Sequence, residues 1–114
     1  MKNTKELYLI IQKKYFLEII KGEKIEEYRD FVEYYINRLF HTDDEGELTK
    51  PKNYETIRFQ MGYRKNAPQM VVECEGISID ADEDGSEFYT YENCNFTIHL
   101  GKILEKINCE NLNN

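Results

Sequence analysis

The segment from Lys21 to Asp30, with the sequence KGEKIEEYRD, is the part of the chain richest in side chains that can do chemistry. Amino, guanidinium and carboxylate groups this close together shift one another's protonation, which is what acid–base catalysis requires. Lys24 and Arg29 can donate hydrogen bonds to a carbonyl or a phosphate, and the carboxylate of Glu27 can accept one from an exocyclic amine. The segment is therefore a candidate site for base recognition or for acid–base chemistry. The alternative is a solvated edge strand whose charges pair with one another.

A strand and a helix are predicted to lead into this segment. The run LYLII at residues 7–11 is typical of a buried strand, which we expect over residues 6–11. Apolar residues then recur at helical spacing and predict a helix over residues 13–21. These residues are Tyr15, Phe16, Ile19 and Ile20. Gly22 follows, where a helix-ending residue in the left-handed conformation is expected.

The segment itself is predicted to be a strand. Its residues 24–29 alternate in period two, so we expect Ile25 on one face and polar side chains on the other. The polar side chains are Lys24, Glu26 and Tyr28. The strand would then present these groups away from the core.

One more helix and three more strands are predicted downstream. Asp30 and Glu33 form a capping pair for the helix, whose apolar positions recur at intervals of three and four up to Phe40. Residues 41–47 are expected to form a solvated loop. The three strands are predicted over residues 54–61, 69–79 and 96–104, with turns at 62–68 and, rich in acidic residues, at 80–86. Helices early and strands late predict an α+β fold with a small mixed sheet, curled or closed.

Length and composition describe one domain. A chain of 114 residues has the usual size of a domain, so we predict a single domain over residues 1–114. Its 40% hydrophobic residues support a core, and no run approaches the roughly 20 apolar residues of a membrane-spanning helix. Three cysteines without CxxC spacing are typical of reduced thiols. We therefore expect a cytoplasmic protein that is not a membrane protein.

The net charge of −7 is unevenly distributed. Residues 1–65 hold 13 Lys and Arg against 12 Asp and Glu, whereas residues 66–114 hold 2 against 10. An acidic total disfavours loose binding along a nucleic-acid backbone and fits a small ligand or a single nucleotide better than a long duplex. A local cationic site built from the first 65 residues remains open.

The pattern G-x-K-x-x-E-x-R, formed by Gly22, Lys24, Glu27 and Arg29, resembles the signature of the ASCH domain, a member of the PUA-like superfamily. As in that family, a strand and an apolar helix precede the glycine, and an aromatic-rich helix follows the arginine. Later segments resemble the family's central and last strands, at residues 54–63, 70–77 and 97–104. The resemblance extends in order over about residues 7–106.

The resemblance implies a compact PUA-like mixed β-barrel with two short helices near the N-terminal half and a cleft around the motif. ASCH domains are generally thought to bind RNA or modified nucleobases, so RNA or a modified nucleoside is the expected partner. The ligand-binding residues it implies, together with nearby candidates, are Gly22, Lys24, Glu27, Tyr28, Arg29, Arg58 and Tyr63. Of the tyrosines, Tyr28, Tyr63 or Tyr8 can stack on an unpaired base.

A bacterial branch of the family hydrolyses an acylated cytidine with a lysine, a threonine three positions later and a glutamate from a later strand. Lys24 stands at the position of the lysine, and Glu73 or Glu75 can supply the late carboxylate. Glu27 replaces the threonine, so the hydroxyl nucleophile is missing and this activity does not carry over intact. Lys24, Glu27, Glu73 and Glu75 remain the candidate catalytic residues of a small hydrolase, either an acylated-cytidine amidohydrolase or a ribonuclease, at the same cleft.

Enzymatic activity is thus left open. Besides a binding domain and an enzyme, a third functional class is possible: an accessory factor whose acidic half binds a basic protein partner. His41 and His99 lack partners at metal-ligand spacing, so a structural role is favoured and no metal is expected. A glycine-rich nucleotide loop is also missing from the sequence, and no cofactor is expected. The sequence does not specify an oligomeric state.

Overall fold

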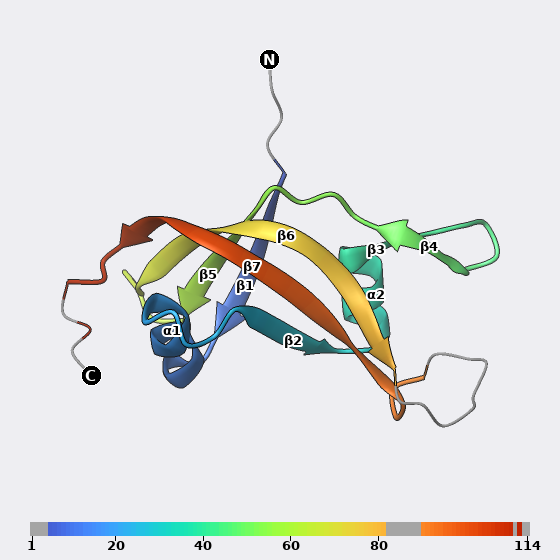
Figure 1. Ribbon diagram of the computed structural model, residues 1–114, viewed down its shortest axis with the longest axis horizontal. Helices are drawn as coiled ribbons and strands as arrows, with labels where there is room; N and C mark the ends of the chain where they lie inside the picture. Colours follow the sequence, from blue (N-terminus) through green and yellow to red (C-terminus); the bar gives the residue numbers. More distant parts are fainter. Residues whose placement is uncertain (1–4, 82–89, 111, 113–114) are drawn as a thin grey trace, which may run out of the picture. The chain divides into compact units, whose positions relative to one another are not determined.

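The computed structural model describes residues 5–81, 90–110 and 112, and they form two short helices and seven strands (Figure 1). In chain order these are β1 (Glu6–Ile11), α1 (Lys13–Ile20), β2 (Glu26–Asp30), α2 (Glu33–Leu39), β3 (Phe40–Thr42), β4 (Leu48–Pro51), β5 (Thr56–Met61), β6 (Gln69–Ala81) and β7 (Cys94–Ile107). Neither helix in this described part has the length and apolar character that a membrane span requires.

Five of the strands form one mixed sheet in the order β1-β5-β6-β7-β2. Strands β1 and β5 are parallel, whereas β5 and β6, and likewise β2 and β7, are antiparallel. Strands β3 and β4 pair as a separate antiparallel hairpin. The α+β class, the two short helices in the N-terminal half and the mixed sheet are thus confirmed, while the PUA-like affiliation stays a prediction.

The chain divides into two compact units, which are described separately. The first comprises residues 1–25, 54–75 and 100–114, and the second comprises residues 26–53 and 76–99. The first unit therefore holds β1, α1 and β5, and the second holds β2, α2 and the β3–β4 hairpin. Strands β6 and β7 each contribute one part to either unit.

In the first unit, alternate residues of the strands and one stripe of α1 form the core. These buried residues include Leu7, Leu9, Ile11, Phe16, Ile19, Ile57, Phe59, Met70 and Val72. Helix α1 ends as predicted, because Gly22 has a φ of +78° and its N–H bonds the carbonyl of Ile19 at 3.0 Å. This left-handed residue stops the helix and turns the chain toward β2.

In the second unit, aromatic rings form the centre of the core. The ring of Phe96 lies 5.0 Å from that of Phe31 and 5.6 Å from that of Phe40, between ring centroids, and all three side chains are buried. Phe31 and Phe40 flank helix α2, so their packing holds both ends of this short helix against β7.

One local prediction in this unit is wrong, and another is correct only in part. Asp30 is the last residue of β2 and pairs with Asn95, so it does not cap α2, whose N-cap is Val32 without a side-chain bond. The predicted loop at residues 41–47 contains the end of β3, and the hairpin turn closes when Asp43 Oδ1 accepts the N–H groups of Glu45 and Glu47, each at 2.9 Å. The acidic turn predicted at residues 80–86 lies mostly outside the described residues.

Candidate functional site

The G-x-K-x-x-E-x-R segment is shared between the two units. Gly22 and Lys24 belong to the first, and Glu27 and Arg29 belong to the second. Lys24 precedes β2, and its Nζ lies 5.2 Å from the centroid of the Tyr15 ring on α1. This is the geometry of a cation–π contact.

Glu27 and Arg29 form a buried ion pair on the inner face of β2. Arg29 Nη2 lies 3.1 Å from Glu27 Oε2, and the two side chains are only 15% and 7% exposed. The guanidinium carbon of Arg29 also lies 5.6 Å from the ring centroid of Tyr35. Each charge loses most of its hydration in this position, so the mutual attraction of the pair has to offset the cost of desolvation.

The placement of Tyr28 on the exposed face is confirmed, but the expectation that Ile25 faces the core is wrong, and this pair explains why. Ile25, expected in the core, precedes β2 and is 67% exposed, whereas Glu27 is 5% exposed and lies opposite the buried Ile98. Hydrophobic periodicity predicts that the apolar residue, Ile25, faces the core. Here the inner face of β2 instead carries two residues of opposite charge, which neutralise each other. Binding of a ligand by Glu27 and Arg29 stays a prediction.

Tyr28 lies on the outer face of β2, where it is 51% exposed. Its hydroxyl donates a hydrogen bond to Glu26 Oε1 at 2.7 Å. This hydrogen bond, followed by desolvation and by the charge of the same carboxylate, raises the pKa of the phenol above its ordinary value. The neutral phenol is therefore favoured in the folded protein.

The pKa of Tyr28 is expected to fall toward its ordinary value in Glu26→Gln, because the carboxylate that stabilises the neutral phenol is gone. A pKa that is higher in the folded state than in the unfolded state stabilises the folded protein at pH values below the unfolded-state pKa. This stabilisation is lost as the pH rises through the folded-state pKa. A pH titration followed by ¹³C NMR of the Tyr28 ring measures the change. The exposed Glu33 supplies the control Glu33→Gln, and an unchanged titration in Glu26→Gln would contradict the assignment.

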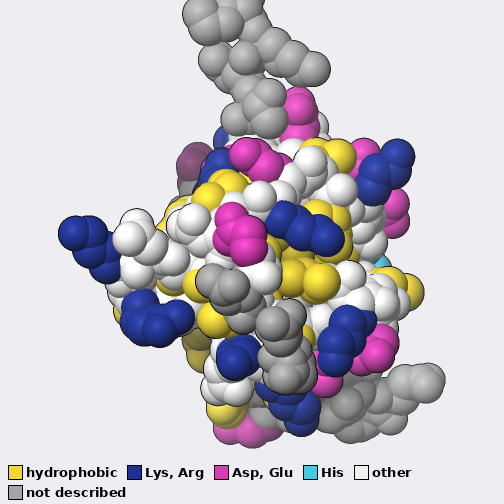
Figure 2. Space-filling view, turned by 90° about the vertical axis from the view of Figure 1, so that its left-hand side faces the viewer, with side chains coloured by type: hydrophobic (Ala, Val, Ile, Leu, Met, Phe, Trp, Pro, Cys, Tyr) yellow, Lys and Arg dark blue, Asp and Glu magenta, His cyan; other side chains and the backbone are white. Residues whose placement is uncertain are grey.

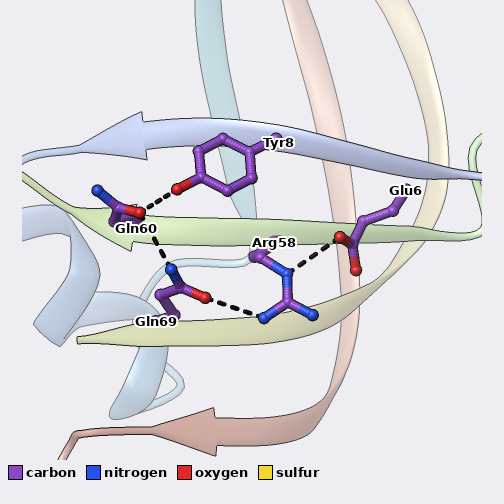
Figure 3. A network of polar contacts seen from close by, with 5 residues as sticks. All are labelled: Glu6, Tyr8, Arg58, Gln60 and Gln69. Atoms are coloured by element: carbon purple, nitrogen blue, oxygen red, sulfur yellow. Dashed lines mark hydrogen bonds and ion pairs between the residues drawn. The ribbon is translucent and has the colours of Figure 1, made fainter. Parts of the chain in front are cut away.

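A fixed row of polar side chains crosses β1, β5 and β6 on the outer face of the first unit (Figure 3). Arg58 donates from Nε to Glu6 at 3.0 Å and from Nη1 to Gln69 at 2.9 Å. Gln69 Nε2 donates to Gln60 Oε1 at 3.0 Å, and the hydroxyl of Tyr8 donates to the same oxygen. We call Tyr8, Arg58, Gln60 and Gln69 the polar row. These hydrogen bonds orient the four side chains relative to one another.

The polar row contains both anticipated and missed residues. Arg58 was expected as a ligand-binding residue, and Tyr8 was one of three tyrosines expected to be able to stack on an unpaired base. Gln60 and Gln69 carry no motif, and the only signal in the sequence is their alternation with buried residues. Tyr63, also a candidate, is 85% exposed in the turn after β5, and the same turn contributes Arg64 to a hollow of about 290 Å³.

Glu73 and Glu75, the late carboxylates, converge on Gly101 of β7. A Cβ at Gly101 would lie 2.8 Å from Glu75 Oε2 and 2.9 Å from Glu73 Oε1. Glu73 Oε1 also accepts the N–H of Lys102 at 3.0 Å. The glycine therefore leaves the room in which the two carboxylates approach each other.

The fold sharpens the charge asymmetry of the sequence. The first unit holds 11 Lys and Arg against 8 Asp and Glu, a balance of +3, and the second holds 4 against 14, a balance of −10. Figure 2 shows Lys and Arg side chains spread around hydrophobic ones on the side where α1 and the C-terminal end of β7 lie in Figure 1. An anionic ligand is thus better accommodated by the first unit.

Comparisons of the chain with protein-family models, with curated proteins and with solved structures found no match in any of the three. The function is therefore inferred from the residues and contacts of the chain itself.

Proposed function

We propose that this chain is a cytoplasmic ASCH-like domain of the PUA-like superfamily that binds RNA or a modified nucleoside, with the polar row as its base-contacting surface. The observation that carries the proposal is the row itself. It places an exposed tyrosine ring, a guanidinium and two amides side by side on one sheet face. These are the groups that stack on unpaired bases and hydrogen-bond to base edges.

Preorganisation supports this use of the row. Arg58 is held through Nε and Nη1, so its planar group is oriented before a ligand arrives. Side chains that are already ordered lose less conformational freedom on binding. The +3 balance of the first unit favours the phosphate of a nucleotide, and Lys24 and Arg64 in the same unit are further cationic candidates.

Tyr8→Ala is expected to weaken binding of a short single-stranded RNA by about 5- to 150-fold, the loss that corresponds to removing about 1–3 kcal/mol of stacking from one base. Tyr8→Phe keeps the ring and loses the hydroxyl that bonds Gln60, so it is expected to weaken binding less. Fluorescence anisotropy gives the Kd, and NMR locates the shifted signals. Tyr91→Ala, which removes a tyrosine 60% exposed in the second unit, is the matched control.

Saturable shifts confined to the polar row support the proposal. Shifts centred on Lys24, Glu27 and Arg29, lost in Lys24→Ala, would move the site to the motif and contradict the role of the row. No shifts with RNA, nucleosides or acylated cytidine would contradict nucleic-acid binding altogether.

Hydrolysis of an acylated cytidine is the second candidate, and the convergence of Glu73 and Glu75 at Gly101 is the observation in its favour. The burial of Glu27 weighs against it, because a side chain only 7% exposed and paired with Arg29 is poorly placed to attack a substrate. Free cytidine and acetate signals in the same NMR sample would establish this activity.

A further inference from the structure

Ser78, His99 and Glu26 form a continuous chain of polar contacts on the outer face of the second unit. Ser78 Oγ lies 2.9 Å from His99 Nε2, and Glu26 Oε2 lies 3.4 Å from His99 Nδ1. Strand pairing produces the second contact, because Glu26 of β2 and His99 of β7 are direct partners in the antiparallel register. The structural role expected for His99 from the sequence did not anticipate either contact.

Each ring nitrogen of His99 thus faces a different partner. A carboxylate at Nδ1 favours the tautomer with its proton on that nitrogen, which leaves Nε2 to accept the hydrogen of the Ser78 hydroxyl. The other oxygen of the Glu26 carboxylate accepts the hydroxyl of Tyr28 at 2.7 Å, so the carboxylate is held from a second side. This is the relation of nucleophile, general base and orienting carboxylate, which is recognised by geometry rather than by sequence order.

The geometry points to a nucleophilic site at which Ser78 cleaves a carboxylic ester. Ser78 Oγ attacks the carbonyl carbon while His99 Nε2 takes its proton, and the carboxylate of Glu26 stabilises the imidazolium. The tetrahedral intermediate then expels the alcohol, which receives the proton from His99. Water attacks the acyl-serine in the same way, with His99 accepting its proton and returning one to Ser78. The sum is ester and water giving acid and alcohol.

Exposure and charge define the substrate class. The side chains of His99 and Glu26 are 39% and 37% exposed, so a small reagent can reach the chain of contacts from solvent. The second unit has a charge balance of −10, which repels anionic substrates. We therefore expect neutral or cationic esters with a good leaving group, rather than amides, whose poorer leaving group needs more stabilisation.

A neutral fluorophosphonate tests the nucleophile in the full chain, because attack by Ser78 forms an O–P bond, releases fluoride and leaves a stable adduct. Mass spectrometry of the intact protein and of its peptides is expected to place the adduct on Ser78. Ser78→Ala is expected to abolish the adduct, and His99→Gln to slow its formation at least about 100-fold, the lower range for a general base. Ser86→Ala, which removes the chain's other serine, is the matched control.

Glu26→Gln is the second variant, in case His99→Gln does not fold, as judged by circular dichroism. It keeps the size of the side chain and is expected to slow labelling without abolishing it. Hydrolysis of p-nitrophenyl acetate by the unmodified chain, with an acetyl group recovered on Ser78, extends the result to a carboxylic ester. Labelling elsewhere, no labelling, or equal rates in the His99 and Glu26 variants and the unmodified chain would overturn the inference.

Discussion

Glu27→Ala and Arg29→Ala are each expected to lower the free energy of unfolding by about 3–5 kcal/mol, because each removes the opposite charge of this ion pair from a largely buried partner. The two side chains are 7% and 15% exposed and their charged atoms lie 3.1 Å apart. Removing one of them strips the remaining group of its counter-charge but does not return it to water. Urea unfolding at neutral pH, followed by circular dichroism, measures the loss.

The pair of Glu6 and Arg58 supplies the matched control. It has the same chemistry at 3.0 Å, but its side chains are 35% and 25% exposed, so Glu6→Ala is expected to cost no more than about 1 kcal/mol. The double variant Glu27→Leu/Arg29→Met replaces both charges and is expected to recover much of the loss. Single losses below about 1 kcal/mol would show that water or other groups compensate the remaining charge.

The expected loss of stability limits which variants can test ligand binding by the motif. If Glu27 and Arg29 stabilise the second unit, a loss of ligand binding in their alanine variants reports unfolding rather than a missing contact. Lys24→Ala avoids the ambiguity, because Lys24 belongs to the first unit and contacts the exposed Tyr15 ring. Comparing the variants separates a binding role of the motif from a structural one.

The parts of the fold that could be predicted from the sequence depend on local patterns. Strand β1, helix α1 and the left-handed Gly22 follow from short-range alternation, helical spacing and one backbone requirement. The β3–β4 hairpin was missed because its strands are three and four residues long and mostly exposed, so they carry no hydrophobic period. The inward Glu27 was missed because only its pairing with Arg29 makes that burial tolerable.

The candidate sites depend on contacts between distant residues, which a motif does not record. Glu6 and Arg58 are 52 positions apart, and Ser78 and His99 are 21 apart. The sequence marks each of them only as a polar residue alternating with apolar ones. The register of the five-stranded sheet brings the members of each pair together. That register depends on which face of each strand is buried.

Phe96→Ala is the second large effect we expect, with a loss of about 3–5 kcal/mol in the free energy of unfolding, the usual cost of removing a fully buried phenylalanine ring. Phe96 is 0% exposed, and its ring packs against those of Phe31 and Phe40. Its strand position is also opposite Arg29, so the ring supports the segment of β2 that holds the ion pair. Urea unfolding measures the total loss.

Amide hydrogen exchange shows which elements lose stability in Phe96→Ala. Because Phe31 and Phe40 flank α2, the cavity left by Phe96→Ala is expected to speed amide exchange in α2 and β2 first. Phe96→Leu keeps most of the apolar volume and is expected to cost less than about 1.5 kcal/mol, whereas Tyr63→Ala, at a side chain 85% exposed, is expected to stay within about 0.5 kcal/mol. Equal losses for Phe96→Ala and Phe96→Leu would contradict this account, since the aromatic contacts and not the filled volume would then stabilise the second unit.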